Sequence, residues 1–548
     1  MIAGGVRKLR QLIADPTLRR WFIGWALGRY KNPDPFMPHV PPYAVDWLPL
    51  TSETPDPPTS FSLLKNEALS EPLQLRLPGQ DIIVSPDQID SLFDHSFGDV
   101  ETELAVHRFQ WVCVQGQDVD PNWVAAVWSA WCDRFSNPDN SWAWHPYTAA
   151  ERAVNILRFA RLFGLPGVED TTLRVLADHG PAIASQLEYF GEHYTSNHLA
   201  NNGRGLFILG LELGLPKCAA LGEEILIQEA ARSFRPSGIL RENSSHYQAL
   251  FFSHYNECAD LATNHHVERA HVLRDIADRA EKALAYLMLP GGLPLVGDIS
   301  PDLEPEKLLS RLKIDPHQAN DLSADGWLRI QSDDWSGLWH CSPEGWSHMP
   351  GHGHQDCGSF ELHFREERLF IDPGRGAYGE QGEAAQYRSA DVHNSLCIND
   401  ADPYPANKPY YSTAFRAAES GPVPILERTS DGVLIEHYGF ARFKNIGSVR
   451  RHWQFRTDGF RVEDVVDGHQ EHYVRRALVT PLPCQFEGDV VIIKGDVGVY
   501  RIHADMPALL KPIKIWNAYG AADEGTQIVF ASDMSLPWRG HIDVEVVL

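Results

Sequence analysis

The stretch GHGHQDCGSFELHF, residues 351–364, marks the point where the sequence changes from helical to strand periodicity. From 359 to 364 apolar and polar residues alternate one by one, and this period of two is typical of a β-strand. Similar runs follow at residues 453–455 and 460–462, on either side of the turn pair Asp458-Gly459, and at 490–493 and 542–547. The chain after about residue 325 is therefore predicted to form an all-β domain.

Upstream, between about residues 100 and 290, apolar residues recur at helical spacing. Two such faces are Ala153, Ile156, Leu157, Ala160 and Phe163, and Leu273, Ile276, Ala280, Leu284 and Leu287. Thr148 and Glu151, three residues apart, predict a capping box at the start of the first of these helices. The change of period indicates a helical domain followed by a β domain.

The composition is that of an ordinary folded protein, with 548 residues of which 43% are hydrophobic and 22% charged. A chain of this length exceeds what one hydrophobic core usually organises, so two large domains are expected. The formal net charge of -25 argues against a general nucleic-acid binder, because such proteins neutralise phosphates with a basic surface. An anionic ligand would likewise need a local basic cleft within this acidic protein.

The eight cysteines are scattered without any C-x-x-C pair, at positions 113, 132, 218, 258, 341, 357, 397 and 484. They indicate neither a disulfide framework nor a thiolate zinc site. Free, mostly buried thiols in a reducing compartment are the expectation.

The N-terminal sequence holds only a short apolar run, from Trp21 to Leu27, and no signal-peptide cleavage site follows it. Nothing reaches the length of a membrane span. We therefore expect a cytoplasmic protein, or a periplasmic one if a leader was removed. Residues 32–58, rich in proline and aromatic residues, predict an extended lead-in to the first domain.

The densest group of polar residues surrounds two histidines, His352 and His354, which point the same way if their segment is extended. One could then bind a metal while the other faces a substrate. His354, Asp372 and His393 offer nitrogen and oxygen ligands suited to zinc, provided that neighbouring strands bring them together. Structural histidines without a metal are the alternative reading.

A second polar group lies in the helical half, where Asn197 and His198 occur within HYTSNHLANNGRG. Some fifty residues later the stretch RENSSHYQALFFSHYNE contains Glu242, His246, Tyr247 and Tyr255. An Asn-His pair among small and polar residues predicts a loop or helix end that faces a cleft, and a capping role is the alternative.

Six motifs in this order resemble the heparinase II/III and oligo-alginate lyase superfamily. They are SNHLANN, an E-N-S-x-x-Y element, GGLPLVGD, GHGHQDCGSFEL, the D-P-G stretch of LFIDPGRGAYG, and RSADVHNSL. WHPYTAAER also resembles the Trp-x-Pro-Tyr segment of that superfamily. The resemblance implies an incomplete (α/α) toroid followed by an antiparallel β-sandwich. We place a lead-in over residues 1–95, the toroid over 96–315 and the β-sandwich over 316–548.

The resemblance also implies an enzyme, a polysaccharide lyase that cleaves an acidic polysaccharide or oligosaccharide at a uronic acid by β-elimination. Asn197 and His198 match the positions that neutralise the uronate carboxylate, and Tyr247 and His352 match the tyrosine and histidine that serve as base and acid. Tyr255 is an alternative to Tyr247. Further substrate-binding candidates are Glu242, His246, Tyr255, Arg204, Arg375, Tyr378 and Arg388. Arg241 is a further arginine beside the motifs, and any of these arginines could instead be an ordinary solvated side chain.

The metal ligands carry over as His354, Asp372 and His393, which match a structural zinc site of the superfamily. Such a zinc would hold the β domain in place beside the cleft without touching the substrate.

Two other functions remain open from the sequence. One is an inverting glycoside hydrolase, because (α/α) toroids also carry such enzymes, and its two carboxylates could come from Glu192, Glu242, Asp298 and Asp356. The other is a non-catalytic protein that binds glycans or assembles exopolysaccharide on the same fold. Alginate, heparan-type glycans and bacterial exopolysaccharides would each present a 4-linked uronate.

Overall fold

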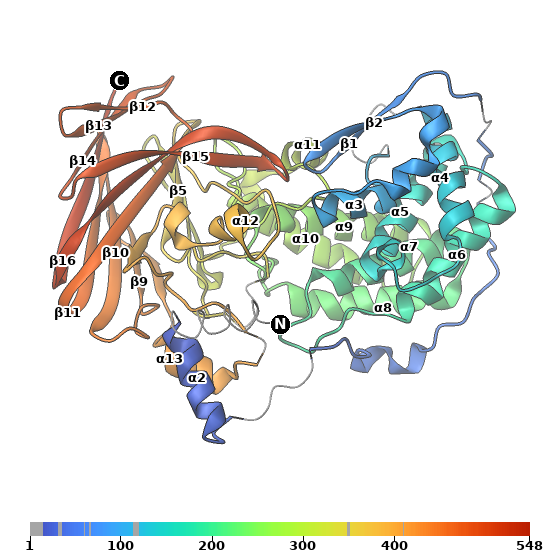
Figure 1. Ribbon diagram of the computed structural model, residues 1–548, viewed down its shortest axis with the longest axis horizontal. Helices are drawn as coiled ribbons and strands as arrows, with labels where there is room; N and C mark the ends of the chain where they lie inside the picture. Colours follow the sequence, from blue (N-terminus) through green and yellow to red (C-terminus); the bar gives the residue numbers. More distant parts are fainter. Residues whose placement is uncertain are drawn as a thin grey trace.

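The computed structural model describes residues 15–30, 36–59, 61–64, 67–112, 120–347, 351–408 and 410–548. Helices fill one half of the molecule and β-sheets the other (Figure 1). The change from helices to strands falls between Pro305–Arg311 and Trp327–Ser332. No helix in the described ranges combines the length and apolar character needed to cross a membrane.

The helical half is built mainly from long helices that follow one another through short connections. These are α3 (Val100–Arg108), α4 (Pro121–Phe135), α5 (Pro146–Phe163), α6 (Glu169–Ala184), α7 (Asn197–Leu213), α8 (Pro216–Ser233), α9 (Ser245–Asn264), α10 (Ala270–Leu287) and α11 (Pro305–Arg311). Both predicted apolar faces are buried except at Phe163, which is 42% exposed at the end of α5. Stacked tryptophans such as Trp128 and Trp131 fill the centre of this core.

The predicted capping box at Thr148 and Glu151 is wrong. Helix α5 begins at Pro146, whose fixed φ suits the first helical position, and no side chain caps it. Thr148 therefore already lies inside the helix, and Glu151 forms an ion pair with Arg204.

The β half consists of two antiparallel sheets that share one apolar core. The smaller sheet contains β3 (Trp327–Ser332), β4 (Trp335–His340), β5 (Ser359–Phe364) and β6 (Glu367–Phe370). The larger sheet contains β7 (Leu396–Ile398), β8 (Ile425–Arg428), β9 (Gly432–His437), β10 (Ile446–Arg456), β11 (Gly459–Thr480), β12 (Cys484–Glu487), β13 (Val490–Lys494), β14 (Val499–Ala504), β15 (Ala508–Ala518) and β16 (Ala521–Val547). All five predicted strand runs are confirmed, and the predicted turn at Asp458-Gly459 joins β10 to β11.

Strand β5 explains how the two halves fit together. Its apolar side packs in the core between the sheets, while its polar side is also buried. There the Nδ1 atom of His363 accepts a hydrogen bond from the backbone of Gly291, in the loop that follows α10. The alternation of apolar and polar residues in β5 therefore does not reflect exposure to solvent. Its polar side is buried and faces the helical half.

The segments outside these two halves connect them. Helix α2 (Pro16–Ala26) lies against α13 (Thr413–Ser420) of the β half, and Trp21 packs on Tyr410 (Figure 1). The lead-in then reaches the helical half, where His39 pairs with Tyr189. It continues into a 3-10 helix (Pro42–Trp47) and the hairpin of β1 (Leu73–Leu77) and β2 (Gln80–Val84), and the remaining short helix is α12 (Gly382–Gln386).

The seven described cysteines are free thiols, as predicted, and all but Cys484 are buried. Cys113 lies outside the described residues.

Candidate active site

A pocket of about 340 Å³ lies where the helical half meets the β half. Seven of the predicted site residues line it: Asn197, His198, Tyr247, His352, Arg375, Tyr378 and Arg388. They come from α7, α9 and the loops that connect strands of the β half. Residues separated by almost two hundred positions in the sequence therefore meet in one cavity.

The N-termini of two helices open onto this pocket. Helix α7 begins at Asn197, where the Ser196 hydroxyl accepts a hydrogen bond from the backbone of His198. Helix α9 begins at Ser245, and the Ser244 hydroxyl accepts one from the backbone of Tyr247. The exposed end of a helix N-terminus carries partial positive charge, so both ends favour an anion in the pocket.

His198 is held by a buried carboxylate. Its Nδ1 atom lies 2.7 Å from Oε1 of Glu188, and its ring packs against Tyr147. Burial alone would lower the pKa of His198, but the Glu188 carboxylate outweighs this effect and raises the pKa above its usual value of 6.5. His198 can therefore present a positive charge to the pocket near neutral pH. Beside it, the side-chain oxygen of Asn197 is buried and has no hydrogen-bond partner among the described residues.

Tyr247 and His352 form a stacked pair, with ring centroids 3.5 Å apart and planes inclined by 7°. The hydroxyls of Tyr247 and Tyr378 are hydrogen-bonded at 2.6 Å, and Tyr378 also donates to the backbone oxygen of Ile299. Burial raises the pKa of Tyr247 well above its usual value. The Tyr247 hydroxyl therefore keeps its proton at neutral pH.

One carboxylate, Asp298, holds the groups on the β side of the pocket. Its oxygens lie 3.2 Å from Nδ1 of His352, 2.8 Å from Nε2 of His354 and 2.9 Å from Nη1 of Arg375. Burial raises the pKa of Asp298, but the hydrogen bonds from the two histidines outweigh burial and keep it well below its usual range. Asp298 is therefore a fixed negative charge.

The predicted zinc ligands come together beside this carboxylate. One ligand atom each of His354, Asp372 and His393 lies within 4.8 Å of the other two. The buried Nδ1 of His354 and Nε2 of His393 have no hydrogen-bond partner among the described residues, and Asp298 contacts the other ring nitrogen of His354. Two imidazoles and a carboxylate, with an outer carboxylate orienting one of them, fit the donor set of a zinc site.

The arginines of the pocket are paired with carboxylates. Arg375 is bound to Asp298, and Arg388 lies 3.0 Å from the exposed Glu380. Arg241 is exposed and does not line the pocket. The predicted basic cleft thus takes a different form, in which His198 and the two helix ends add positive potential to arginines that are already partly neutralised.

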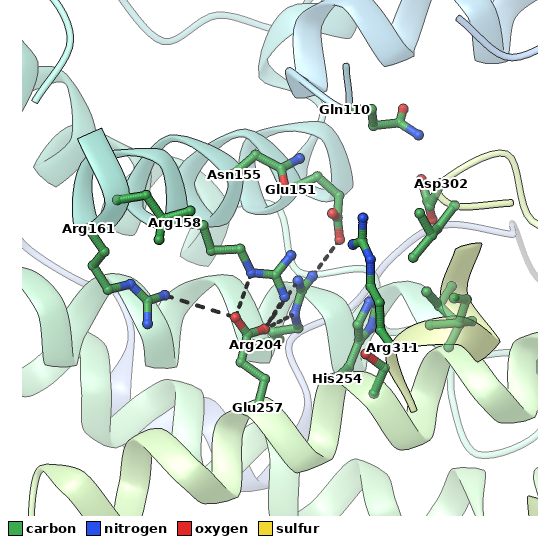
Figure 2. A pocket seen from close by; sticks show the side chains of 15 residues that line it. Gln110, Glu151, Asn155, Arg158, Arg161, Arg204, His254, Glu257, Asp302 and Arg311 are labelled. Carbon is green, nitrogen blue, oxygen red and sulfur yellow. Dashed lines mark hydrogen bonds and ion pairs between the residues drawn. The ribbon is translucent and has the colours of Figure 1, made fainter. Parts of the chain in front are cut away.

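Arg204 lies elsewhere, in a second pocket of about 400 Å³ within the helical half. Figure 2 shows it beside Glu151 and Glu257, with Arg158 and Arg161 directed toward the same Glu257. Arg204 is fully buried and forms ion pairs with these two carboxylates. Its role is therefore structural, and the predicted contact with substrate is not supported.

Three other predicted residues lie behind the pocket wall. Tyr255 donates its hydroxyl proton to the backbone oxygen of Leu226 inside the helical core. His246 is fully buried and accepts a hydrogen bond from the backbone of Ser300, and burial lowers its pKa to about 4. Glu242 is 1% exposed, with Oε2 lying 3.4 Å from Nε2 of His352. The geometry favours Tyr247 over Tyr255 as the tyrosine that faces the pocket.

Several contributors were not among the site residues predicted for a lyase. Asp302 accepts a hydrogen bond from the Tyr147 hydroxyl and forms an ion pair with Arg108. The three residues form one wall of the pocket. Tyr147 belongs to the WHPYTAAER segment and Asp298 ends GGLPLVGD, so both lie in motifs that the sequence already singles out. Glu188 lies in no such motif.

The chain is similar to a known protein family and to several solved structures. Residues 314–516 match the family model described as Heparinase II/III-like, C-terminal. A structure of Heparinase III superposes with a TM-score of 0.63 at 17% identity, covering 83% of this chain and 79% of that one. A mutant of the heparan sulfate lyase HepC from Pedobacter heparinus gives 0.53 at 15% identity, with 82% and 78% covered. No curated protein matches the chain by sequence.

These matches confirm the predicted resemblance and the predicted fold. The chain has the fold of an incomplete (α/α) toroid followed by an antiparallel β-sandwich, as in the Heparinase III structures, and most of its β-sandwich domain matches the heparinase II/III-like C-terminal model.

Proposed function

We propose that this chain is a polysaccharide lyase that cleaves a uronic-acid-containing acidic glycan by β-elimination. The observation that carries the proposal is the meeting of Asn197 and His198 with the stacked pair of Tyr247 and His352 in one pocket. β-Elimination requires groups that neutralise the substrate carboxylate and groups that transfer protons, and the pocket contains both.

Neutralisation of the substrate carboxylate is the first requirement. The proton on C5 of a uronate is weakly acidic while the neighbouring carboxylate keeps its charge, so the developing enediolate needs hydrogen-bond donors. Asn197 and His198 stand at the N-terminus of α7, and Glu188 raises the pKa of His198 against the effect of burial and so favours its charged form. We assign the carboxylate to these two residues.

Proton transfer is the second requirement. The C5–H bond breaks, its electron pair forms the C4–C5 double bond, and the C4–O bond breaks as the leaving oxygen takes a proton. Tyr247 keeps its hydroxyl proton, so we assign it to the leaving oxygen. His352, stacked on Tyr247, is assigned as the base that takes the proton from C5, and Tyr378 positions Tyr247 through their hydrogen bond.

An inverting hydrolase is less well supported, because it needs an acid and a base carboxyl on opposite sides of the bond. Asp298 is held by two histidines and an arginine and stays ionised. Asp356 lies on His340 and does not line the pocket, while Glu192 is exposed and accepts a hydrogen bond from Tyr189.

Zinc is proposed at His354, Asp372 and His393. When bound, the ion would supply a fixed positive charge that holds these three side chains, and through Asp298 the position of His352 depends on the same group. No step of the elimination passes through the ion.

The test is ultraviolet absorbance during digestion of a panel of uronate polymers and oligomers. Elimination leaves a conjugated C4–C5 double bond in the new non-reducing uronate, so a rise in absorbance with new chain ends is expected. New reducing ends without that absorbance would establish hydrolysis. Binding without any cleavage across the panel would favour a non-catalytic role in glycan binding or exopolysaccharide assembly.

A further inference from the structure

Two cysteine thiols of the β domain, Cys341 and Cys357, are in contact, with their Sγ atoms 3.3 Å apart. Cys341 directly follows β4, and Cys357 lies two positions before β5, with Gly358 between them. Because His340 pairs with Ser359 at the ends of these strands, the two cysteines continue across the same strand pair. The contact is therefore fixed by the register of the sheet.

No comparable thiol pair occurs among the other described cysteines. A shared metal does not explain the contact either, since the only group of three possible ligands within the described ranges is His354, Asp372 and His393. The close contact therefore sets Cys341 and Cys357 apart from the other described cysteines.

Of the two cysteines, Cys357 is the one that borders a pocket. Cys357 lines a pocket of about 300 Å³ in the β domain, together with His340 and Tyr404, although its residue is only 8% exposed. Cys341 is 2% exposed and lies behind it. A small thiol oxidant can thus meet Cys357 first and Cys341 second.

We propose that Cys341 and Cys357 form a disulfide when the protein meets a small disulfide oxidant such as oxidised glutathione. Cys357 as thiolate attacks one sulfur of the oxidant and releases one thiol. Cys341 then displaces the second thiol, so that two S–H bonds are exchanged for one S–S bond and the oxidant takes up both protons and both electrons. The sulfurs need to approach by only about 1.3 Å to reach bonding distance.

The position of this bond gives it a role. The chain between the two cysteines carries His352 and His354, so a disulfide would join the two strand ends from which the histidine segment departs. The Cys341 thiol and burial raise the pKa of Cys357, and oxidation should therefore be slow at neutral pH and faster under mildly alkaline conditions.

The experiment treats the full-length protein with oxidised glutathione at mildly alkaline pH, blocks remaining thiols with an alkylating agent during denaturation, and maps peptides by mass spectrometry. We expect the thiol count to fall from eight to six, with one peptide linking Cys341 to Cys357. Oxidation should also raise the thermal unfolding midpoint by roughly 5 °C, reversibly on reduction. Neither readout depends on lyase activity.

Cys357→Ala and Cys341→Ala should each abolish the linked peptide and the rise in midpoint. The matched control is Cys397→Ala, which removes a buried thiol of β7 in the same domain and should leave both intact. Retention of all eight thiols in the parent protein, or their loss in any other pairing, would overturn the proposal. A linked peptide without a higher midpoint would overturn the role as a brace.

Discussion

The phenol ring of Tyr247 lies flat on the imidazole of His352, although Tyr247 belongs to the first turn of α9 and His352 to a loop of the β half. Stacking at 3.5 Å leaves no room for either ring to turn independently. The two proton-exchanging groups are therefore fixed relative to each other by the way the two halves of the chain meet.

Replacing Tyr247 with phenylalanine should remove the proton donor and keep the stacked ring. We expect kcat to fall by roughly 10² to 10⁴, the usual contribution of a general acid, with little change in the unfolding midpoint. Absorbance assays on any active substrate measure the rate.

Tyr255→Phe is the matched control, because it removes a hydroxyl from the same helix. Its hydroxyl bonds the backbone oxygen of Leu226 in the core, so we expect a loss of about 1 kcal/mol in stability and nearly unchanged turnover. The opposite pattern, with Tyr255→Phe inactive and Tyr247→Phe active, would contradict the assignment.

The pH dependence of kcat/KM should reflect His198. Glu188 raises the pKa of His198 and Glu242 adds to this effect, while burial and the charge of Arg108 oppose it. The charged form of His198 therefore predominates below pH 6.5 and is lost as pH rises through the raised pKa, and kcat/KM should fall over that upper range. Glu188→Gln should move this fall to lower pH.

Glu192→Gln removes a neighbouring carboxylate that bonds Tyr189 and does not contact His198. It should leave the pH profile where it is. An alkaline limb that stays in place in Glu188→Gln would show that His198 does not need its charge.

Metal analysis should find about one zinc per chain in protein purified without chelator. His354→Ala and His393→Ala should lose the metal. They should also lose thermal stability, because a metal that binds the folded chain and not the unfolded chain stabilises the folded state. His363→Ala is the control, since this buried histidine on β5 bonds Glu361 and Gly291 and should cost stability without loss of metal. Parent protein that contains no zinc would contradict the proposed zinc site.

Two arginines of the predicted site should respond in opposite ways. Arg204→Ala would leave Glu151 and Glu257 without their shared cation inside the helical half, and a loss of about 3–5 kcal/mol in stability is expected. Arg388→Ala, at the pocket and partly exposed, should raise KM with little change in the unfolding midpoint. A Tm series and Michaelis kinetics on both variants separate the two roles.

The groups that meet in the pocket could be predicted because each lies in one of the motifs that carry the resemblance to the heparinase II/III superfamily. Asn197 and Tyr247 also lie in the first turns of α7 and α9, whose N-caps are Ser196 and Ser244, so both residues stand at the cleft end of their helices. Arg204 follows Asn197 by seven residues, and at 1.5 Å per residue it sits about 10 Å deeper along α7. Tyr255 lies about 12 Å beyond Tyr247 for the same reason. Within a helix, a residue that is close to a motif in the sequence can therefore lie far from the pocket.

The central role of Asp298 could not be predicted from the sequence. A lone aspartate has no spacing that identifies its partners, and its three neighbours come from two later segments, one with His352 and His354 and one with Arg375. Glu188 is similar, because its bond to His198 depends on how the chain before α7 folds back.

The meeting of the two halves has a consequence for how the protein could be taken apart. Asn197, His198, Tyr247 and Asp298 precede α11, whereas His352 and Arg375 follow β3. A cut between Arg311 and Trp327 therefore divides the pocket between two polypeptides, neither of which contains a complete set of groups. Each fragment alone should be inert, and turnover should return only on mixing, with a dependence on fragment concentration that reports how strongly the halves hold together.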